Sequence, residues 1–451
     1  MNRPVFTVAG GKRNPWLRAP LVVALGFVLA ILVGSWLLCL SASVVPSHRA
    51  LSWPQALFMA TSATCVTGLS VVNVAHDLSL FGQIVLLGLI QIGGLGIMTL
   101  AFLVLLSLGG ETSSGGEVLQ STLGELVYRY RPRRALLLVL GITICLEAAG
   151  AVFLHTQLDE AHAGWKSVFL SISAFCNAGF DNLDEGLAPY HASWGVGAPL
   201  LLLWLVGGLG FIVPAAVAAK VSRGAGSTLD LTAWMILRAS LLLIPLGAVL
   251  FAVTEHTGLL AGRGMGEQLL LCLFQGNTPR TAGFSMLDYG HAGRATLFSQ
   301  IGLMLIGGAP CSTAGGMKMT AVWVFGASLW SRMLNRDQVL IGRRAIPVGV
   351  IRQAMIVCVC MLLAFGVFSA AVATIEPALR FDALSFEVAS ALGTVGLSTG
   401  ITSTLSEPSQ LLIVLAMFMG RLGPLGFVYA FVRVRPKPTS VRYPESDVCV
   451  G

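Results

Sequence analysis

A short glycine-containing loop occurs four times along this chain of 451 residues, and it constrains the fold more than any other feature. The four copies end at Gly68, Gly179, Gly283 and Gly396, which follow one another at nearly even spacing. Each copy ends a short apolar segment, and each short segment lies between two long ones. Repetition at a fixed spacing is the sequence signature of a repeat architecture. We therefore expect one structural unit written out four times.

The composition of the chain indicates where this repeat folds. Hydrophobic residues make up 55% of the chain and charged residues only 11%, with a mean hydropathy of +0.81. A soluble protein carries about a quarter of charged residues, and the long apolar segments here reach the ~20 residues that cross a bilayer. Spans are expected near 20–41, 80–107, 134–156, 196–219, 230–254, 296–326, 348–374 and 408–432. The sequence predicts a polytopic membrane protein.

The distribution of Lys and Arg predicts how the spans are oriented. The net charge is +7, and the basic residues concentrate in segments that the predicted spans place on one side. Those segments are 1–20, 129–134, 220–238, 332–352 and 433–442. By the positive-inside rule that side is the cytoplasm, so both termini are expected there. The distribution of Lys and Arg in this chain therefore reflects its orientation in the membrane and does not indicate a nucleic acid partner.

The short apolar segments are too short to cross a bilayer and suit re-entrant half-helices. Each unit then reads span, half-helix, loop and span, and because two crossings return the chain to the cytoplasm, all four units share one orientation. Parallel repeats are related by an axis along the membrane normal. The predicted fold is an all-α polytopic membrane protein with four parallel M1–P-helix–M2 repeats around one central pore, pseudo-fourfold and potassium-channel-like. The expected boundaries are a cytoplasmic N-terminus at 1–19, repeats at 20–110, 134–220, 230–327 and 348–432, and a cytoplasmic tail at 433–451.

The four loops have the chemistry of a cation filter. Glycine adopts the positive φ angles that can turn carbonyl groups inward, and rings of backbone carbonyls replace the hydration shell of K⁺ in selective channels. The C-terminal ends of the half-helices, which point at the centre, carry partial negative charge that favours a cation. The alternative is that these glycines only make turns. The predicted K⁺-binding residues, the only metal site expected, are Val66, Thr67, Gly68, Asn177, Ala178, Gly179, Thr281, Ala282, Gly283, Thr394, Val395 and Gly396. Outside the filter, Asp181, Asp184, Glu185 and Asp288 are expected to draw cations to the outer mouth.

A second fourfold element lies in the last span of each unit, where two adjacent small residues recur. The pairs are Gly93-Gly94, Gly207-Gly208, Gly307-Gly308 and Gly420-Arg421. Close helix packing is one explanation of the glycines. Arg421 is the exception, and an arginine at the bilayer centre normally faces a cavity or a partner. We expect it to face the pore below the filter as an electrostatic barrier; the alternative is a structural pair with Glu147.

The third unit departs from the others at the same depth. Glycines and Pro310 interrupt its last span, and small polar residues fill it, so a continuous lipid-facing helix is excluded. We predict a flexible loop at 307–316, below the filter, that acts as a gate; a static broken helix is the alternative. The predicted gate residues are Gly307, Gly308, Ser312, Thr313, Ala314, Gly315 and Gly316, together with Arg421.

Four segments of the chain resemble the superfamily of K⁺ transporters that includes the TrkH, KtrB and plant HKT proteins, and the number of spans is that of KtrB. They are Asn-Ala-Gly-Phe at 177–180, Arg-Thr-Ala-Gly-Phe at 280–284, Ser-Thr-Ala-Gly-Gly-Met-Lys at 312–318 and Gly-Thr-Val-Gly-Leu-Ser at 393–398. The resemblance implies potassium uptake across a bacterial inner membrane by a homodimer with one pore per subunit. It also implies a separate cytoplasmic RCK ring, similar to KtrA or TrkA, that binds ATP/ADP or NAD(H) and controls the gate. Gly68 favours K⁺, because serine at this position accompanies Na⁺ permeation in the family. Asn277-Thr278-Pro279 departs from the pattern and leaves the end of the third half-helix open.

Two other functional classes, a symporter and a membrane enzyme, are alternatives to a potassium-conducting protein. A symporter that couples K⁺ to Na⁺ or H⁺ stays possible on the sequence, with Glu147 as one group that could take part. An enzyme is not expected, because the chain has no His-Glu-x-x-His motif and no Gly-x-Ser-x-Gly motif with triad partners. No cofactor is expected in this chain, with K⁺ as the permeant ion.

Overall fold

The computed structural model describes residues 19–46, 49–107, 132–210, 213–214, 216–217, 231–310, 312–342, 344–423 and 426. The predictions for the N-terminus at 1–18, for most of 218–230 and for the tail at 433–451 lie outside these residues. Within them the protein is helical apart from one short hairpin.

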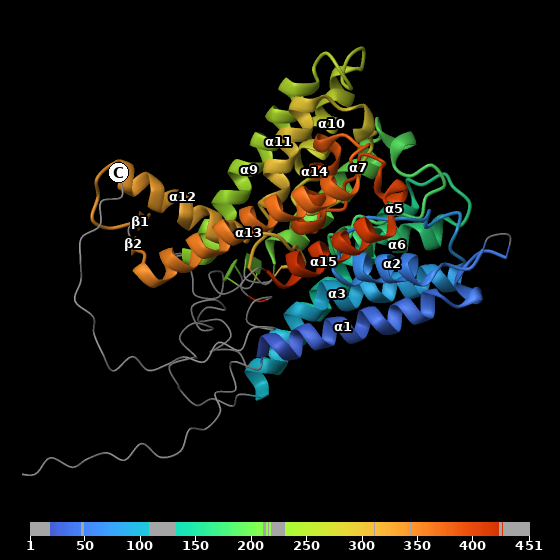
Figure 1. Cartoon of the computed structure of the whole chain (residues 1–451), viewed down its shortest axis with the longest axis horizontal. Helices are drawn as coiled ribbons and strands as arrows, with labels where there is room; N and C mark the ends of the chain where they lie inside the picture. Colours follow the sequence, from blue (N-terminus) through green and yellow to red (C-terminus); the bar gives the residue numbers. More distant parts are fainter. Residues whose placement is uncertain are drawn as a thin grey trace, which may run out of the picture.

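Long and short helices alternate along the chain (Figure 1). The long helices are α1 (Ala19–Leu38), α3 (Leu80–Ser107), α5 (Pro132–His155), α7 (Trp194–Leu209), α9 (Leu231–Glu255), α13 (Val348–Ile375) and α15 (Glu407–Leu422). The short helices are α2 (Trp53–Thr64), α6 (Ala163–Phe175), α10 (Met265–Asn277) and α14 (Phe381–Gly393). The predicted sixth span is divided into α11 (Arg294–Leu305) and α12 (Met319–Met333). Single turns of 3₁₀ helix lie at Ser41–Ser43, Ala188–Tyr190, Tyr289–His291 and Thr402–Thr404.

The helix boundaries follow local signals in the sequence. Helix α2 begins after Ser52, whose backbone N–H donates to the Gln55 side chain at 3.0 Å, with Pro54 in the first turn. Proline is accepted there because the first N–H groups of a helix have no partner within it. By length and composition α9 and α13 can each cross a bilayer, and shorter apolar helical stretches occur at Val23–Leu38, Leu80–Gly96, Leu140–His155 and Trp194–Leu209.

The last helix of each unit contacts the short helix of the next unit. Helix α3 contacts α6, α7 contacts α10, α11 contacts α14, and α15 returns to α2. The four units therefore follow one another around a closed ring. The short helices lie inside, and the equivalent residues Phe58, Phe169, Phe274 and Phe386 have no exposed surface.

The outward faces of the long helices are apolar. Leu241 on α9 and Leu363 on α13 are 72% and 63% exposed, and Val152 on α5 is 70% exposed. Such exposure is unfavourable in water and suits a lipid surrounding. The apolar surface agrees with the membrane location predicted from composition.

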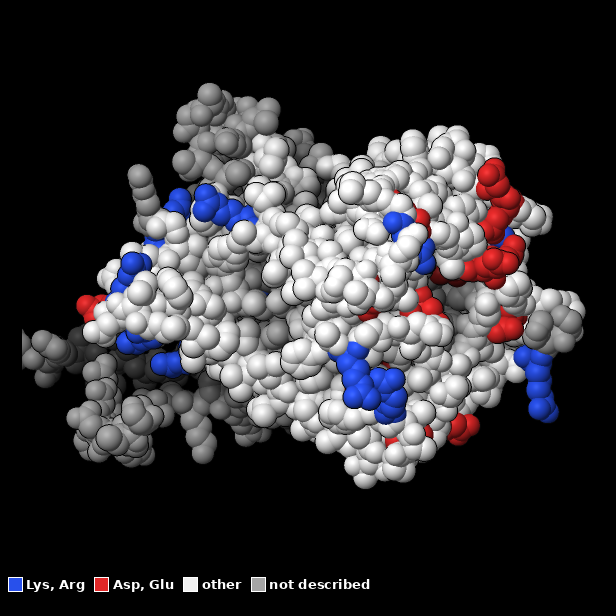
Figure 2. Space-filling model, turned by 90° about the horizontal axis from the view of Figure 1, so that it is seen from above, with Lys and Arg blue, Asp and Glu red and all other residues white. Residues whose placement is uncertain are grey.

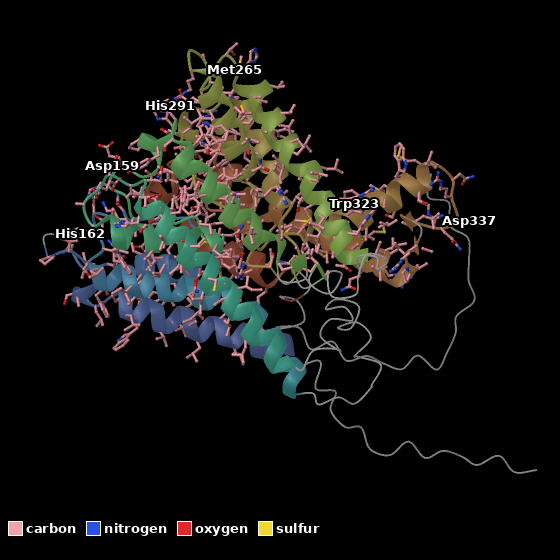
Figure 3. All side chains as sticks on the ribbon, turned by 180° about the vertical axis from the view of Figure 1, so that it is seen from behind. Asp159, His162, Met265, His291, Trp323 and Asp337 are labelled. Atoms are coloured by element: carbon pink, nitrogen blue, oxygen red, sulfur yellow. The ribbon has the colours of Figure 1, made fainter. Side chains whose placement is uncertain are left out.

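Acidic residues gather toward one end of the molecule, whereas basic residues occur at both ends. Figure 2 shows basic atoms at the end that carries α12 and most acidic atoms at the opposite end. In Figure 3, Asp159, His162, Met265 and His291 lie at that opposite end, whereas Trp323 and Asp337 lie on α12 and beyond it. Helix α12 stands apart from the ring of helices and carries a hairpin of β1 (Leu340–Ile341) and β2 (Arg344–Ala345), in which Ile341 pairs with Arg344.

Candidate ion site where the four loops meet

The four loops share one backbone conformation. The residue two positions before each glycine has a positive φ: 57° at Val66, 59° at Asn177, 66° at Thr281 and 50° at Thr394. The glycines have φ of 98°, 70°, 79° and 99°. Positive φ is uncommon for residues other than glycine, and Val and Thr are branched at Cβ, which makes it less favourable still. Its recurrence in four loops of different sequence indicates that the surrounding structure imposes it.

The glycines bring the four loops into mutual contact. A Cβ atom on Gly179 would lie 2.9 Å from the carbonyl oxygen of Ala282 in the next loop. In the same way, a Cβ on Gly68 would meet the Ala178 oxygen, one on Gly283 the Val395 oxygen, and one on Gly396 the Thr67 oxygen. The contacts run from the first loop to the second, third and fourth and back to the first. Backbone carbonyls of all four loops therefore gather at one place, and no other residue type fits at the four glycines.

Hydroxyl groups on the short helices hold the loops from behind, in two different ways. The Ser62 and Ser390 hydroxyls accept hydrogen bonds from the N–H groups of Gly68 and Gly396 at 3.1 and 3.0 Å. The Ser173 hydroxyl instead donates to the carbonyl of the residue after Gly179, at 2.6 Å. The sequence analysis missed this layer, although a serine six residues before the glycine is visible in three of the four repeats.

The stretch from the equivalent phenylalanine to the glycine is one residue shorter in the third unit than in the others. Phe274 lies nine residues before its glycine, whereas Phe58, Phe169 and Phe386 lie ten residues before theirs. Thr278 takes the place of the serine and donates to the Phe284 carbonyl at 2.6 Å. The departure at Asn277-Thr278-Pro279 is thus a shortening of the helix end, and the loop itself keeps the common conformation.

The predicted gate segment lies against the C-terminal ends of short helices and against the loops that follow them. Ala309 N–H donates to the Gly208 carbonyl at 3.0 Å in the second unit, and the Thr313 hydroxyl lies 3.0 Å from Oδ1 of Asn177 in the second loop. A Cβ on Gly315 would overlap the side chain of Thr394 in the fourth loop. Ser312 and Thr313 are buried. The segment therefore contacts the second and fourth loops at once and packs directly beneath them.

Arg421 joins this segment to the first unit. Its side chain is 3% exposed, Nη1 donates to the Thr313 carbonyl, and Nη2 donates to the Gly93 carbonyl at 2.6 Å. The alternative of a pair with Glu147 is wrong in this structure. The Glu147 carboxylate instead accepts from the Gln91 amide at 3.0 and 3.2 Å, and Cys176 is its other side-chain neighbour.

The paired glycines in the last spans lie against the short helices, in agreement with the explanation that they allow close helix packing. A Cβ on Gly93, Gly207 or Gly420 would overlap the carbonyl oxygen of Thr64, Phe175 or Leu392, near the C-terminal end of a short helix. Gly94 faces Cys176 closely, at 2.7 Å from a Cβ to Sγ, while Gly208 has only Asn177 Nδ2 nearby at 3.6 Å. The first glycine of each of these pairs therefore lets a span approach the short helix of its own unit.

The acidic residues predicted to lie at the outer mouth differ in whether a basic side chain pairs with them. Lys166 Nζ lies 2.9 Å from Asp184 Oδ2 and 2.7 Å from Glu160, and the hydrogen bond from Lys166 lowers the pKa of Asp184. Asp288 pairs with His291 at 2.9 Å. Asp181 lacks such a cation among the ion pairs of the described residues, and burial raises its pKa to about 6. Asp184 and Asp288 are therefore paired, whereas Asp181 and Glu185 are in none of the ion pairs of the described residues.

Comparisons with known proteins agree with this geometry. The family model of TrkH, described as a cation transport protein, matches residues 14–443. The chain is 35% identical to the Ktr system potassium uptake protein B of Bacillus subtilis over 99% of this chain and 100% of that one. It is 34% identical to the protein of that name from Vibrio alginolyticus (100% and 99% covered) and 31% identical to the potassium/sodium uptake protein NtpJ of Enterococcus hirae (95% and 96%). The crystal structure of the potassium transporter TrkH from Vibrio parahaemolyticus superposes with a TM-score of 0.71 over 96% of this chain and 87% of that one, at 19% identity, which shows a shared fold.

Proposed function

The chain belongs to the TrkH family of cation transport proteins, and from this premise we propose that it is a potassium uptake protein that conducts K⁺ through the ring of four loops. The observation that carries the proposal is the cyclic contact between the glycine of each loop and a carbonyl of the next. Carbonyl oxygens arranged in rings take over the hydration shell of K⁺. The filter residues are those predicted from the sequence, at 66–68, 177–179, 281–283 and 394–396.

The segment at 307–316 is the gate in this proposal, and Arg421 is its latch. The segment packs beneath the loops, where it would block an ion that leaves the filter. Arg421 donates to its Thr313 carbonyl and to Gly93 in another unit, which ties it in place. The guanidinium also places a positive charge below the filter, where it repels a cation by roughly 0.7–3 kcal/mol at about 6 Å. Conduction then requires both the segment and the arginine to move.

A separate cytoplasmic protein would drive this movement. The Bacillus and Vibrio relatives are each named as protein B of a Ktr system. We propose that an RCK ring, with ATP/ADP or NAD(H) bound to it, acts on a homodimer of this chain at the bacterial inner membrane. Helix α12 and its hairpin extend from the gate segment and expose Arg332, Arg336 and Arg344, so a protein bound there is connected directly to the gate.

A symporter that couples K⁺ to Na⁺ or H⁺ is the second candidate, on one observation. Glu147 is 6% exposed on a predicted span, and its side-chain partners are an amide and a thiol rather than a cation. An uncompensated carboxylate in a membrane is a common feature of ion-coupled transport. Coupled transport predicts ⁸⁶Rb⁺ uptake that follows a Na⁺ or H⁺ gradient in the wild type but not in Glu147→Gln.

The test of the filter is ⁸⁶Rb⁺ flux into proteoliposomes, with K⁺ and Na⁺ as competitors. We expect uptake in the wild type that K⁺ inhibits and Na⁺ does not, and loss of this discrimination in Gly68→Ser, because the serine side chain must displace the Ala178 carbonyl. Gly88→Ala is the matched control, since a Cβ there meets nothing within 4 Å. If the wild type stays silent after a candidate RCK protein is added, or if Gly68→Ser keeps its selectivity, the filter proposal is wrong.

A further inference from the structure

In three of the four units a contact lies just outside the filter, between the short helix and the residue two positions after the glycine. Ser70 donates to Met59 Sδ at 3.3 Å in the first unit, and Gln275 Nε2 donates to Ser285 Oγ at 2.9 Å in the third. In the fourth unit the same place on the helix is occupied by Glu387, which accepts from Ser398 at 2.6 Å. Leu170 is the residue at this place in the second unit. The position is thus equivalent by repeat, but only the fourth unit has a carboxyl group there.

Glu387 is buried and receives hydrogen bonds on both oxygens. Its side chain is 1% exposed; Oε1 accepts from the Ser398 hydroxyl and from Thr399 N–H at 3.0 Å, and Oε2 accepts from the Thr402 hydroxyl at 2.8 Å. An ionised carboxylate only accepts hydrogen bonds, so this arrangement of donors suits the charged form. Among the ion pairs of the described residues, none includes Glu387. Among the described residues, an ionised Glu387 would therefore be a negative charge that no basic side chain neutralises.

The hydrogen bonds of Glu387 connect it to the residues at the outer end of the filter. Ser398 and Thr399, which hydrogen-bond to Glu387, are the second and third residues after Gly396. A fixed charge in a site shielded from water acts more strongly on an ion than the same charge at the surface. A cation at the outer end of the filter would be attracted to it without touching it.

We propose that Glu387 sets the affinity of the outer filter for the permeant cation, through its charge and not through direct coordination. The inference rests on the proposed filter function and adds a residue to it. A unit charge about 10 Å from an ion, at an effective dielectric constant of ~20–40, alters binding by roughly five- to fifteen-fold. Because the attraction does not depend on ion size, Rb⁺ and Na⁺ should be affected by the same factor.

The repeat supplies a matched test, in which the charge is moved to the equivalent place in the third unit. In Glu387→Gln we expect KM for ⁸⁶Rb⁺ uptake to rise about five- to fifteen-fold, with the maximal rate and the Rb⁺/Na⁺ ratio unchanged. The double variant Glu387→Gln/Gln275→Glu restores a carboxylate behind the filter and should recover most of the wild-type KM. Unchanged KM in Glu387→Gln, or a double variant that remains as weak as the single one, overturns the proposal.

A second pair of variants keeps the test decisive if Glu387→Gln does not fold. Ser398→Ala and Thr402→Val each remove one donor and leave the carboxylate in place, so KM should stay close to that of the wild type, because the charge that acts on the ion is unchanged. A large rise of KM in either variant would show that the hydrogen bonds and not the charge matter. Selective uptake by the wild type is the reference throughout: its absence would refute the filter proposal, whereas normal wild-type uptake together with an unaltered KM in Glu387→Gln refutes only the role of Glu387.

Discussion

Removal of the Arg421 side chain should open the gate. The guanidinium makes two hydrogen bonds, one to Thr313 in the gate segment and one to Gly93 in the first unit. A hydrogen bond to a charged group contributes about 1.5–3 kcal/mol. If the bond to Thr313 alone is specific to the closed position, its loss raises the ratio of open to closed forms about tenfold to a hundredfold. Loss of the positive charge below the filter acts in the same direction.

The assay for this prediction is ⁸⁶Rb⁺ flux into proteoliposomes at matched protein density, without any cytoplasmic partner. We expect Arg421→Ala to exceed the wild type at least about tenfold, as the weaker estimate of the lost hydrogen bond requires. Arg421→Lys is the control, because it keeps the charge but cannot bridge two carbonyls with a planar fork; it should give an intermediate flux. Equal flux in Arg421→Ala and wild type would refute both the latch and the electrostatic barrier.

Three further predictions follow from single contacts. Gly93→Ala should lower the free energy of unfolding by about 1–3 kcal/mol, because its Cβ overlaps the Thr64 carbonyl and overpacking costs this much; Gly88→Ala should be neutral, as measured by thermal unfolding in detergent. For Asp181, whose pKa is raised to about 6, acidification from pH 7 to 5 neutralises the carboxylate and should raise KM for ⁸⁶Rb⁺, while Asp181→Asn should show no such step. A deletion within 309–315 should raise flux, and adding Arg421→Ala to it should produce a smaller gain than Arg421→Ala gives alone, because both changes release the same contact and only the charge is then left to remove.

The number and order of the helices could be predicted from the sequence because they depend on local patterns. The apolar segments at 80–107 and 348–374 appear as α3 and α13 almost to the residue, and the break after Leu305 follows from the glycines and Pro310. The shared φ angles at Val66, Asn177, Thr281 and Thr394 could not be predicted, because a branched residue has no intrinsic preference for them. The contacts between neighbouring loops, which accompany this conformation, join residues about a hundred or more positions apart.

The partners of buried polar groups were the least predictable part of the site. Arg421 binds Gly93 and Thr313, which are 328 and 108 residues away in the sequence, and no local pattern selects either of them. The pair of Arg421 with Glu147 was reasonable by charge alone, but Glu147 lies with Gln91. The roles of the filter and gate residues in ion binding stay predictions, to be tested by the flux measurements above.

Two of the departures from fourfold repetition lie at one level of the molecule, and they depend on one another. Units one and two have a glycine pair at this level, unit three has the gate segment, and unit four has Arg421. Without Arg421, the carbonyl of Thr313 would be buried without this hydrogen-bond donor. Without the gate segment, the buried guanidinium of Arg421 would lose one of its acceptors. Both changes are unfavourable, because buried polar groups need hydrogen-bond partners. Each departure therefore compensates the other in the closed state. In the proposed gating mechanism, opening would separate the two groups, so the contact that holds the gate closed would also set the free energy needed to open it. A partner that moves α12 would then act on this contact.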